Sequence, residues 1–310
     1  MLYAAIDVGS NTIRILIGSV KDRKVDRIFS DRAVTRLAQG LNERGYLREE
    51  NIESSVKVMR GAAETISRYG VKVIKAVGTE ALRRAGNSIE FIERVFSETG
   101  IRIKIITEEE EARLTMQGVL SGLKISGDCL IIDIGGGSTE WIIYDYENPG
   151  ESISGSMPIG VVNLLEGYVK GDPPSYGELK KLEDIIESHI RGLRKHISKK
   201  DLKAFVGTGG TVTTLASIDL SLDSYKPDLV HGYHLGIDRL KDIRDRLVSI
   251  PMSERVKVRG LEPERADLII PGIIFTIKIT DMFKFDELIV SDYGLLEGLL
   301  LEGGGDEKGI

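Results

Sequence analysis

The 310-residue sequence lacks several features that define whole classes of protein. Cys129 is its single cysteine, and the apolar residues around it indicate a buried structural thiol instead of a disulfide or a metal ligand. No apolar run approaches the ~20 residues that are needed to span a bilayer. Basic residues do not predominate, because the net charge is -6, and this argues against sequence-independent binding of nucleic acid.

The beginning of the chain carries no recognisable targeting signal. Residues 1–8 are apolar, but they are too few for a signal peptide and have no basic leader. We therefore expect a cytoplasmic protein with neither nucleic acid nor a membrane among its partners. With 310 residues and 41% hydrophobic content the chain can form two cores, so we expect two domains.

The stretch from Leu130 to Trp141 is the most informative motif in the sequence. An apolar strand ends at Asp133, a glycine turn follows, and a second strand begins near Glu140. Glycines let backbone N–H groups approach an anion without hindrance from a Cβ atom. The two carboxylates flank the turn with no basic residue between them, and a divalent cation that bridges carboxylates and phosphate oxygens suits them. A simple hairpin is the alternative for such a turn in isolation.

The same scheme recurs near the start of the chain. Residues 5–12 again form a strand, an aspartate, a glycine and a hydroxyl-bearing turn, and Asp7 lies 126 positions before Asp133. A second pair of motifs, around Gly78 and Gly207, is 129 positions apart. Two matched pairs at nearly one spacing indicate an internal duplication. A third pair, the strands 103–106 and 288–290, is about 184 positions apart, so we expect an insertion in the second half at about residues 219–251.

Hydrophobic periodicity predicts a similar order of elements in both halves. In the first half we expect strands at 3–8, 13–20, 25–30, 71–77 and 101–106, and helices at 49–69 and 89–96. In the second half we expect strands at 130–134, 140–145, 151–158 and 288–290, and helices at 179–197 and 263–283. The alternation of strand and helix predicts parallel pairing in part of each sheet.

Four consecutive glutamates, residues 108–111, follow Thr107. Thr107 and Glu110 have the spacing of a capping box, and the helix dipole stabilises acids in a first turn, so structure alone can explain the run. Crowded carboxylates also repel one another, which raises the pKa of a member toward the range of a general base. One of the four could serve both purposes.

These motifs together resemble the exopolyphosphatase and guanosine pentaphosphate phosphatase family, within the actin, sugar-kinase and Hsp70-like superfamily. The matching stretches follow one another along nearly the whole chain: 7–11, 78–83, 110–114, 133–140, 207–211, 231–232 and 260–267. The resemblance implies an α/β fold of two duplicated ribonuclease H-like (actin-like ATPase) domains with an active-site cleft between them. The expected domains are 1–124, to which the C-terminal helix 292–304 could be joined, and 125–291.

The resemblance also implies roles for individual residues. Glu111 resembles the general base that activates water. Asp133 and Glu140 resemble the groups that hold magnesium or manganese or that orient the water, with Asp7 as a further candidate for the metal. The expected cradle for the phosphate chain consists of Ser10, Asn11, Arg83, Gly135, Gly136, Gly137, Ser138, Gly209, Gly210 and Thr211.

The sequence departs from the family pattern in two places. The family commonly has an arginine at the position of Leu296. A leucine cannot make the contact with an anion that such an arginine would make. Long members continue into an additional helical region, whereas this chain resembles the short, two-domain members. We therefore expect cleavage of the terminal phosphoanhydride more than processive action on long polyphosphate chains, because a long bound chain would need surface beyond the cleft.

The implied activity is the release of terminal phosphate from inorganic polyphosphate, or from guanosine pentaphosphate, and the motifs do not rank these two partners. No Ser-His-Asp arrangement or cysteine nucleophile is evident, which favours direct attack by water. One rival is an ATP-dependent small-molecule kinase of the same fold, although Pro271-Gly272 has only one glycine where its adenosine pocket would need two. Another is a nucleotide-binding protein without turnover, against which the joint presence of Glu111, Asp133 and Glu140 argues. The protein could also form a homodimer.

Overall fold

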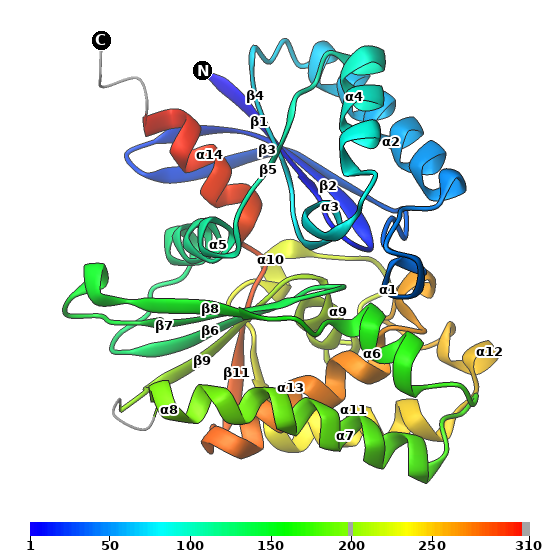
Figure 1. The fold of residues 1–310 in the computed structure, drawn as a ribbon. Coiled ribbons are helices and arrows are strands. Elements are labelled where there is room, and N and C mark those ends of the chain that lie inside the picture. The colour runs from blue at the N-terminus through cyan, green and yellow to red at the C-terminus, as the bar shows by residue number, and fades with distance from the viewer. Residues whose placement is uncertain (198–200, 306–310) are drawn as a thin grey trace. The chain divides into compact units, whose positions relative to one another are not determined.

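The chain forms two compact units in the computed structural model, which describes residues 1–197 and 201–305 (Figure 1). The first unit comprises Met1–Gly122 and Tyr293–Ile310, and the second comprises Leu123–Asp292. Each unit contains one mixed sheet with helices packed on it, which confirms the predicted α/β class.

The sheet of the first unit has the strand order β3-β2-β1-β4-β5. The first three strands form an antiparallel meander, and β1 pairs with β4, and β4 with β5, in parallel. Alternation along β1 directs side chains to both faces of the sheet, and nearly all of them are buried. The strands are β1 (Leu2–Val8), β2 (Thr12–Lys21), β3 (Lys24–Val34), β4 (Val73–Gly78) and β5 (Ile103–Ile105).

Helices cover this sheet on both faces. Figure 1 shows α2 and α4 on one side of the sheet and α5 and α14 on the other. Ala4, Ile6 and Val8 of β1 belong to the core under α2 and α4, whereas Tyr3 and Ala5 belong to the core under α5 and α14. The helices of the unit are α1 (Leu41–Arg44), α2 (Glu49–Arg68), α3 (Glu80–Arg84), α4 (Ser88–Thr99), α5 (Glu108–Gly122) and α14 (Leu295–Gly305).

Glycines allow α5 and α14 to pack closely. A Cβ atom on Gly118 would lie 1.8 Å from the carbonyl oxygen of Gly294, and one on Gly298 would lie 2.0 Å from that of Leu114. Only glycine fits at either position. The C-terminal helix is thereby an integral part of the first unit, although 170 residues separate it from the rest of that unit in the chain.

The sheet of the second unit has the strand order β10-β11-β9-β6-β7-β8. The strands β6, β7 and β8 form an antiparallel meander, β6, β9 and β11 are mutually parallel, and β10 is an antiparallel edge strand. The strands are β6 (Cys129–Ile134), β7 (Thr139–Tyr144), β8 (Ile153–Met157), β9 (Ala204–Thr208), β10 (His234–Gly236) and β11 (Glu287–Ser291).

The two sheets share one topology. Strands β1 to β5 correspond in order and direction to β6, β7, β8, β9 and β11, which confirms the internal duplication. The first hairpin pairs Val8 with Ile13, and its counterpart pairs Ile134 with Thr139, so both turns have the same length. The additional strand β10 comes from the region 219–251, where the sequence predicts an insertion.

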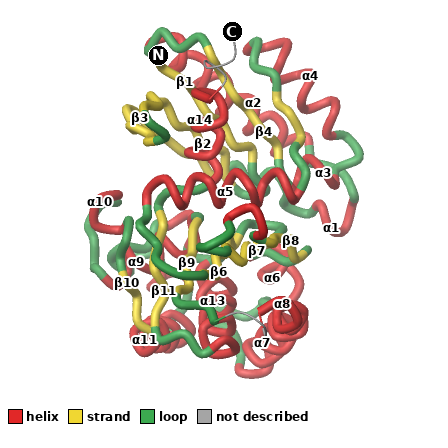
Figure 2. Tube along the Cα trace, turned by 90° about the vertical axis from the view of Figure 1, so that its left-hand side faces the viewer, coloured by secondary structure: helices red, strands yellow, loops and turns green. Residues whose placement is uncertain are grey.

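Helices α7, α11 and α13 pack side by side on one face of the second sheet (Figures 1 and 2). Their apolar side chains form one core with those of β6, β9 and β11. The helical elements are η1 (Pro149–Glu151), α6 (Val161–Tyr168), α7 (Tyr176–Ile190), η2 (Arg191–Leu193), α8 (Arg194–Ile197), α9 (Gly210–Asp219), α10 (Pro227–Val230), α11 (Ile237–Ser249), α12 (Met252–Arg255), η3 (Pro263–Arg265) and α13 (Ile269–Phe283).

Two predicted helices have different bounds in the structure. The continuous helix expected to reach Ile197 is wrong, because α7 ends at Ile190 and the chain tightens into a 3-10 turn that contains Gly192, a poor helix former. The helix expected from Pro263 begins only at Ile269. Pro271 lies in the first turn of α13, where a missing N–H costs little.

Within the described residues, no helix has the length and apolar character that crossing a membrane requires.

Candidate active site

The first turn of the chain connects β1 to β2 and places Asp7 opposite Arg14. The turn is closed by a hydrogen bond from Gly9 N to Thr12 O, 3.1 Å long. Arg14 donates from Nε (2.9 Å) and Nη2 (2.6 Å) to Oδ2 of Asp7, a residue that is only 4% exposed. The second oxygen, Oδ1, is buried and accepts no hydrogen bond from a described residue.

Ser10 and Asn11 lie in this turn and are buried. The Ser10 hydroxyl donates to Oε2 of Glu80 at 2.7 Å, and the other oxygen of Glu80 accepts from Arg84. Because the proton of the hydroxyl is committed to a buried carboxylate, Ser10 can contribute its backbone N–H to an anion more readily than its side chain. The amide of Asn11 makes one long contact, 3.4 Å to the hydroxyl of Thr12.

Arg83 and Glu111 come from different helices and form an ion pair. Arg83 lies in α3, just beyond the end of β4, and its Nη1 donates to Oε2 of Glu111 (2.7 Å) and to the carbonyl oxygen of Ile106 (3.0 Å). Glu111 is 8% exposed. Nη2 of Arg83 is buried and has no acceptor among the described residues. A buried N–H of a guanidinium is costly to leave unsatisfied, so this atom is a candidate donor to an anionic ligand.

The remaining acids of the α5 N-terminus have other surroundings. Thr107 and Glu110 form the predicted capping box, with reciprocal hydrogen bonds of 3.1 Å, and Glu108 and Glu109 are exposed. Glu109 and Glu110 are not the member whose pKa crowding was expected to raise. A backbone hydrogen bond lowers the pKa of Glu109, and the hydrogen bond from Lys104 lowers the pKa of Glu110. Glu111 is therefore the one buried acid of the run.

In the second unit, Asp133 and Glu140 lie directly opposite each other on β6 and β7. Glu140 is 2% exposed, and its Oε1 accepts a hydrogen bond of 3.0 Å from the Ser156 hydroxyl on β8. Like charges in a cross-strand pair are destabilising, whereas the corresponding pair of the first unit, Asp7 and Arg14, is an ion pair. Two facing carboxylates are also the hard oxygen ligands that a divalent cation prefers.

The glycine turn between β6 and β7 rests on the beginning of α6. A Cβ atom on Gly160 would lie 2.4 Å from the carbonyl carbon of Gly136, so the helix starts in direct contact with the turn. Ser138 is 4% exposed, and Thr139 anchors the end of the turn by donating to Ile159 O at 2.7 Å. The loop that the sequence predicts as a phosphate cradle is therefore rigidly supported.

The N-terminus of α9 contributes a second backbone feature of the site. Gly209 has a φ of 85°, and a Cβ atom there would lie 2.3 Å from Oδ1 of Asp133, so the carboxylate lies against this residue. The N-cap residue is a glycine and provides no side-chain cap, and the first N–H groups of a helix are suited to an anion. Thr211 is 6% exposed, and its hydroxyl makes a long contact, 3.5 Å, with Ile134 O.

Arg265 lies over this helix N-terminus, and the sequence motifs alone did not indicate it as a site residue. A Cβ atom on Gly210 would lie 2.2 to 2.4 Å from three guanidinium atoms of Arg265, whose Nε also donates to Glu262 at 3.0 Å. Arg265 thus lies at the positive end of the α9 dipole, with the carboxylate of Glu262 as one anionic partner. Arg14 was also missed, although the hairpin register that places it opposite Asp7 could have revealed it.

The structure thus brings the predicted residues together in two sets. Arg83 and Glu111 meet in the first unit, where Asp7, Ser10 and Asn11 also lie, and Asp133, Glu140, the glycine turn and the α9 N-terminus meet in the second. Leu296 packs at the edge of the core that α5 and α14 share. Across residues 1–197 and 201–305, no group of three or more His, Cys, Asp or Glu is placed to hold a metal ion.

Two duplicated α/β units, each with a glycine-containing turn after its first strand, define a protein of the actin-like ATPase fold. Residues 16–304 match the Ppx/GppA phosphatase family, and the chain belongs to that family. The crystal structure of the Aquifex aeolicus Ppx/GppA family member is similar over 100% of this chain and 99% of its own, with 38% identity and a TM-score of 0.83.

The names of three relatives refer to different activities. The bifunctional 3-dehydroquinate synthase/phosphatase of Fusobacterium nucleatum is 32% identical over 97% of this chain, which spans 46% of that protein. Exopolyphosphatase 2 of Mycobacterium tuberculosis is 27% identical over 96% of this chain and 97% of its own length. The guanosine-5'-triphosphate,3'-diphosphate pyrophosphatase of Aliivibrio fischeri is 30% identical over 96% of this chain, which spans 58% of it.

Proposed function

We propose that the protein is a phosphoanhydride hydrolase that releases terminal phosphate from inorganic polyphosphate by direct attack of water. The names of two relatives, an exopolyphosphatase and a guanosine-5'-triphosphate,3'-diphosphate pyrophosphatase, support this class of reaction. Hydrolysis of a terminal phosphoanhydride requires neutralisation of charge on the transferring group, an oriented water, and an acceptor for the proton of that water.

The position of Glu111 is the observation that carries the proposal. Its neighbour Glu110 performs the capping, so Glu111 is free of that structural task and lies buried with one oxygen 2.7 Å from Arg83. In the proposed reaction Glu111 accepts the proton of the attacking water. Arg83 holds the orientation of this carboxylate, and its buried Nη2 would donate to a phosphate oxygen.

The remaining predicted residues would bind the phosphate chain. Backbone N–H groups of Ser10 and Asn11, of residues 136–138 and of Gly209, Gly210 and Thr211 are suited to anionic oxygens, whereas the N–H of Gly135 closes the turn on Ser138 O. The guanidinium of Arg265, above Gly210, would add a charged contact at the α9 N-terminus. Such donors are fixed by the fold before the substrate arrives, and this limits the reorganisation that the reaction requires.

We also propose that magnesium or manganese takes part. Asp133 and Glu140 fit such an ion, because two facing carboxylates on neighbouring strands are hard oxygen ligands. Asp7 stays a further candidate, since its Oδ1 accepts no hydrogen bond from a described residue. Magnesium typically binds one or two carboxylates and completes its shell with water and substrate phosphates, so a group of three protein ligands is not required. The bound ion would neutralise phosphoryl charge.

Side-by-side initial rates would test the proposed function. The substrates are polyphosphates of several lengths, guanosine pentaphosphate and ATP, each at saturating magnesium, with phosphate release as the measured quantity. We expect release from polyphosphate, and a higher rate with guanosine pentaphosphate would make that nucleotide the main substrate. Phosphate release from none of them would refute the hydrolase proposal. Transfer of phosphate from ATP to an added acceptor would favour a kinase, and binding of nucleotide without any turnover would favour a silent binding protein.

A further inference from the structure

The three carbonyl groups of the glycine turn all point toward α6. The turn itself is closed by a hydrogen bond of 3.0 Å from Gly135 N to Ser138 O. Each of the three glycine carbonyls accepts a hydrogen bond from a successive residue at the start of α6. The bonds are Val161 N to Gly135 O (3.0 Å), Val162 N to Gly136 O (2.8 Å) and Asn163 Nδ2 to Gly137 O (3.2 Å).

This arrangement determines the direction of the next three N–H groups. In a planar trans peptide the C=O and the N–H of one peptide unit point in opposite directions. Because the carbonyls of residues 135–137 point toward α6, the N–H groups of Gly136, Gly137 and Ser138 point away from it. None of these three donates to an acceptor among the described residues. Successive N–H groups on one side of a turn form an anion-binding concavity.

One of the three contacts depends on a side chain. Backbone N–H groups hold the carbonyls of Gly135 and Gly136, and almost any sequence can supply them, whereas Gly137 O is held by the amide of Asn163. In the first unit the residue that corresponds to Gly137 is Asn11, whose carbonyl accepts from two backbone groups, Thr35 N and Arg36 N, both at 3.0 Å. Asn163 therefore does in the second unit what the backbone does in the first.

We propose that Asn163 is a positioning residue for phosphate binding. By fixing the carbonyl of Gly137 it fixes the peptide between Gly137 and Ser138, and so directs the Ser138 N–H toward a phosphate oxygen. The inference rests on the proposed function, in which this turn binds the phosphate chain. The competing explanation is that the contact only anchors α6, in which case its loss would change stability and leave phosphate binding as it was.

Binding of a methylene-bridged triphosphate analogue, which cannot be hydrolysed, separates these explanations. Calorimetry on the full chain would give the Kd of the analogue for the parent, for Asn163→Ala and for the nearly isosteric Asn163→Asp. We expect Asn163→Ala to raise Kd roughly 3- to 10-fold, the worth of one hydrogen bond. We expect a larger rise in Kd for Asn163→Asp, because its carboxylate repels Gly137 O. The peptide between Gly137 and Ser138 would then rotate, and the Ser138 N–H would no longer point toward the phosphate. In parallel, the amide signal of Ser138 in 15N NMR spectra should shift with the analogue in the parent and much less in either variant.

Asn87→Ala is the matched control. Asn87 also bonds to backbone through its side chain, with Oδ1 accepting from Leu47 N (2.8 Å) and Nδ2 donating to Leu47 O (3.1 Å). It should lower the melting temperature and leave Kd unchanged. If both Asn163 variants bind the analogue within twofold of the parent, or if the parent does not bind it, the inference is overturned. If the parent binds the analogue with the predicted dependence on Asn163 but cleaves no polyphosphate, the hydrolase proposal fails and the positioning role stands.

Discussion

At the scale of single residues, the four glutamates at the start of α5 are separated by their surroundings. They share one helix dipole, yet Glu108 and Glu109 are exposed, Glu110 completes the capping box and Glu111 is buried against Arg83. A property that depends on the dipole alone would be common to all four. A property that belongs to Glu111 alone must arise from its burial and its arginine.

Replacing Glu111 tests whether this residue is the general base. We expect Glu111→Gln to lower kcat by roughly two to four orders of magnitude, because the amide cannot accept the proton of water. The phosphate-binding donors remain, so substrate should still bind. Stability should fall by about 1–3 kcal/mol, because a charge-assisted hydrogen bond to Arg83 is weakened. Phosphate-release kinetics and thermal unfolding give the two quantities.

Glu108→Gln and Glu109→Gln are the controls, since both acids share the first turn of the helix and are exposed. We expect both to keep the turnover of the parent, with at most a small fall in melting temperature for Glu109→Gln, because a backbone hydrogen bond lowers the pKa of that exposed carboxyl. Equal losses of activity in all three variants would contradict the assignment. So would a Glu111→Gln variant that keeps more than about a tenth of the parental rate.

The facing carboxylates of the second unit give a prediction about metal dependence. Asp133→Asn removes one charge from the pair with Glu140, so the concentration of magnesium or manganese for half-maximal rate should rise roughly tenfold or more. Asp145→Asn, just beyond β7, keeps the acceptor for Asn148 N and should leave this concentration unchanged. Metal titrations of the three proteins provide the measurement. Full activity of the parent after exhaustive chelation would refute the metal proposal.

Much of the candidate site could be predicted from the sequence because its residues lie in short motifs. Asp133, Glu140 and the glycines between them are contiguous, and their local pattern predicts the hairpin that the structure contains. Arg265 and Asn163 could not be found in this way, because each reaches the site only through the packing of a distant helix. Local pattern carries no information on such contacts.

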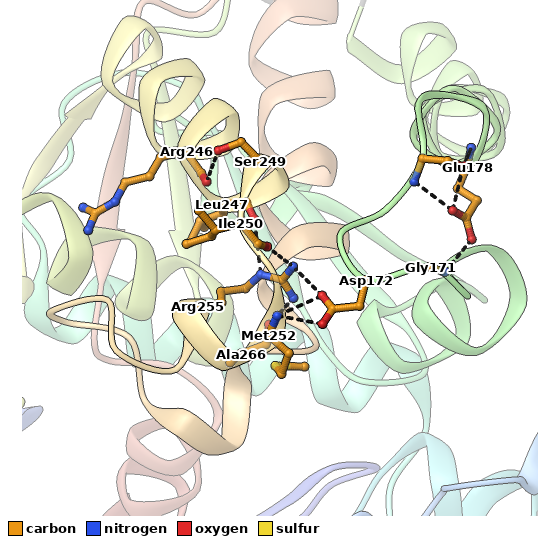
Figure 3. A network of polar contacts seen from close by, with 11 residues as sticks. Gly171, Asp172, Glu178, Arg246, Leu247, Ser249, Ile250, Met252, Arg255 and Ala266 are labelled. Carbon is orange, nitrogen blue, oxygen red and sulfur yellow. Dashed lines mark hydrogen bonds and ion pairs between the residues drawn. The ribbon is translucent and has the colours of Figure 1, made fainter.

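At the scale of elements, the loop before α7 shows how one side chain can organise a helix start. Figure 3 shows Glu178 with its hydrogen bonds to Gly171 and to neighbouring backbone. It also shows Asp172, the residue after Gly171, bonded to Met252 and the buried Arg255. The Ser175 hydroxyl and three backbone N–H groups donate to the Glu178 carboxylate and lower its pKa to about 2. The carboxylate closes a capping box with Ser175 and also ties down the preceding loop.

This pKa predicts how the stability of the helix start depends on pH. A carboxylate whose pKa is lowered on folding stabilises the native state above its unfolded pKa of about 4.5, and the effect is lost as the pH falls through about 2. Glu178→Gln should therefore lower the melting temperature at neutral pH, and the difference from the parent should shrink between pH 4.5 and pH 2. Thermal unfolding across that range is the measurement, and Glu183→Gln, on the same helix, is a suitable control. A difference that stays constant with pH would contradict the assignment.

Most elements were predictable because their hydrophobic periodicity is strong and their ends are marked by glycine. Helix α2 is expected at 49–69 and is found at Glu49–Arg68, and the strand expected at 130–134 is found at Cys129–Ile134. The misplaced boundaries lie where apolar residues continue past a real break. The apolar pattern of α7 continues to Leu193 and Ile197, but Leu193 lies in the 3-10 turn η2 and Ile197 in the separate short helix α8. Both side chains are buried, so the apolar pattern alone does not distinguish one continuous helix from a helix that is interrupted.

At the scale of the whole molecule, each unit has its own sheet and core, but only the second is continuous in sequence. The first unit is completed by α14, whose Leu295, Leu299 and Leu300 are at most 2% exposed and pack with Tyr3 and Ala5. At the start of α14, Glu297 accepts from Arg27 Nε (2.9 Å) and from Gly294 N (2.7 Å). Burial raises the pKa of Glu297, and the charge of Arg27 opposes that shift.

Removal of residues 293–310 should therefore unfold the first unit. Burying three leucines contributes about 5–9 kcal/mol, which is comparable with the whole stability of a typical domain. In a chain that ends at Asp292 we expect limited proteolysis to degrade residues 1–122 and to spare 123–292, because the second unit keeps its core. A peptide of residues 293–305 added in trans should restore protection of the first unit. Glu297→Gln in the full chain separates the ion pair from the leucines and should cost far less stability than the deletion. Protection of residues 1–122 in the shortened chain equal to that in the parent would show that α14 is dispensable for the first unit.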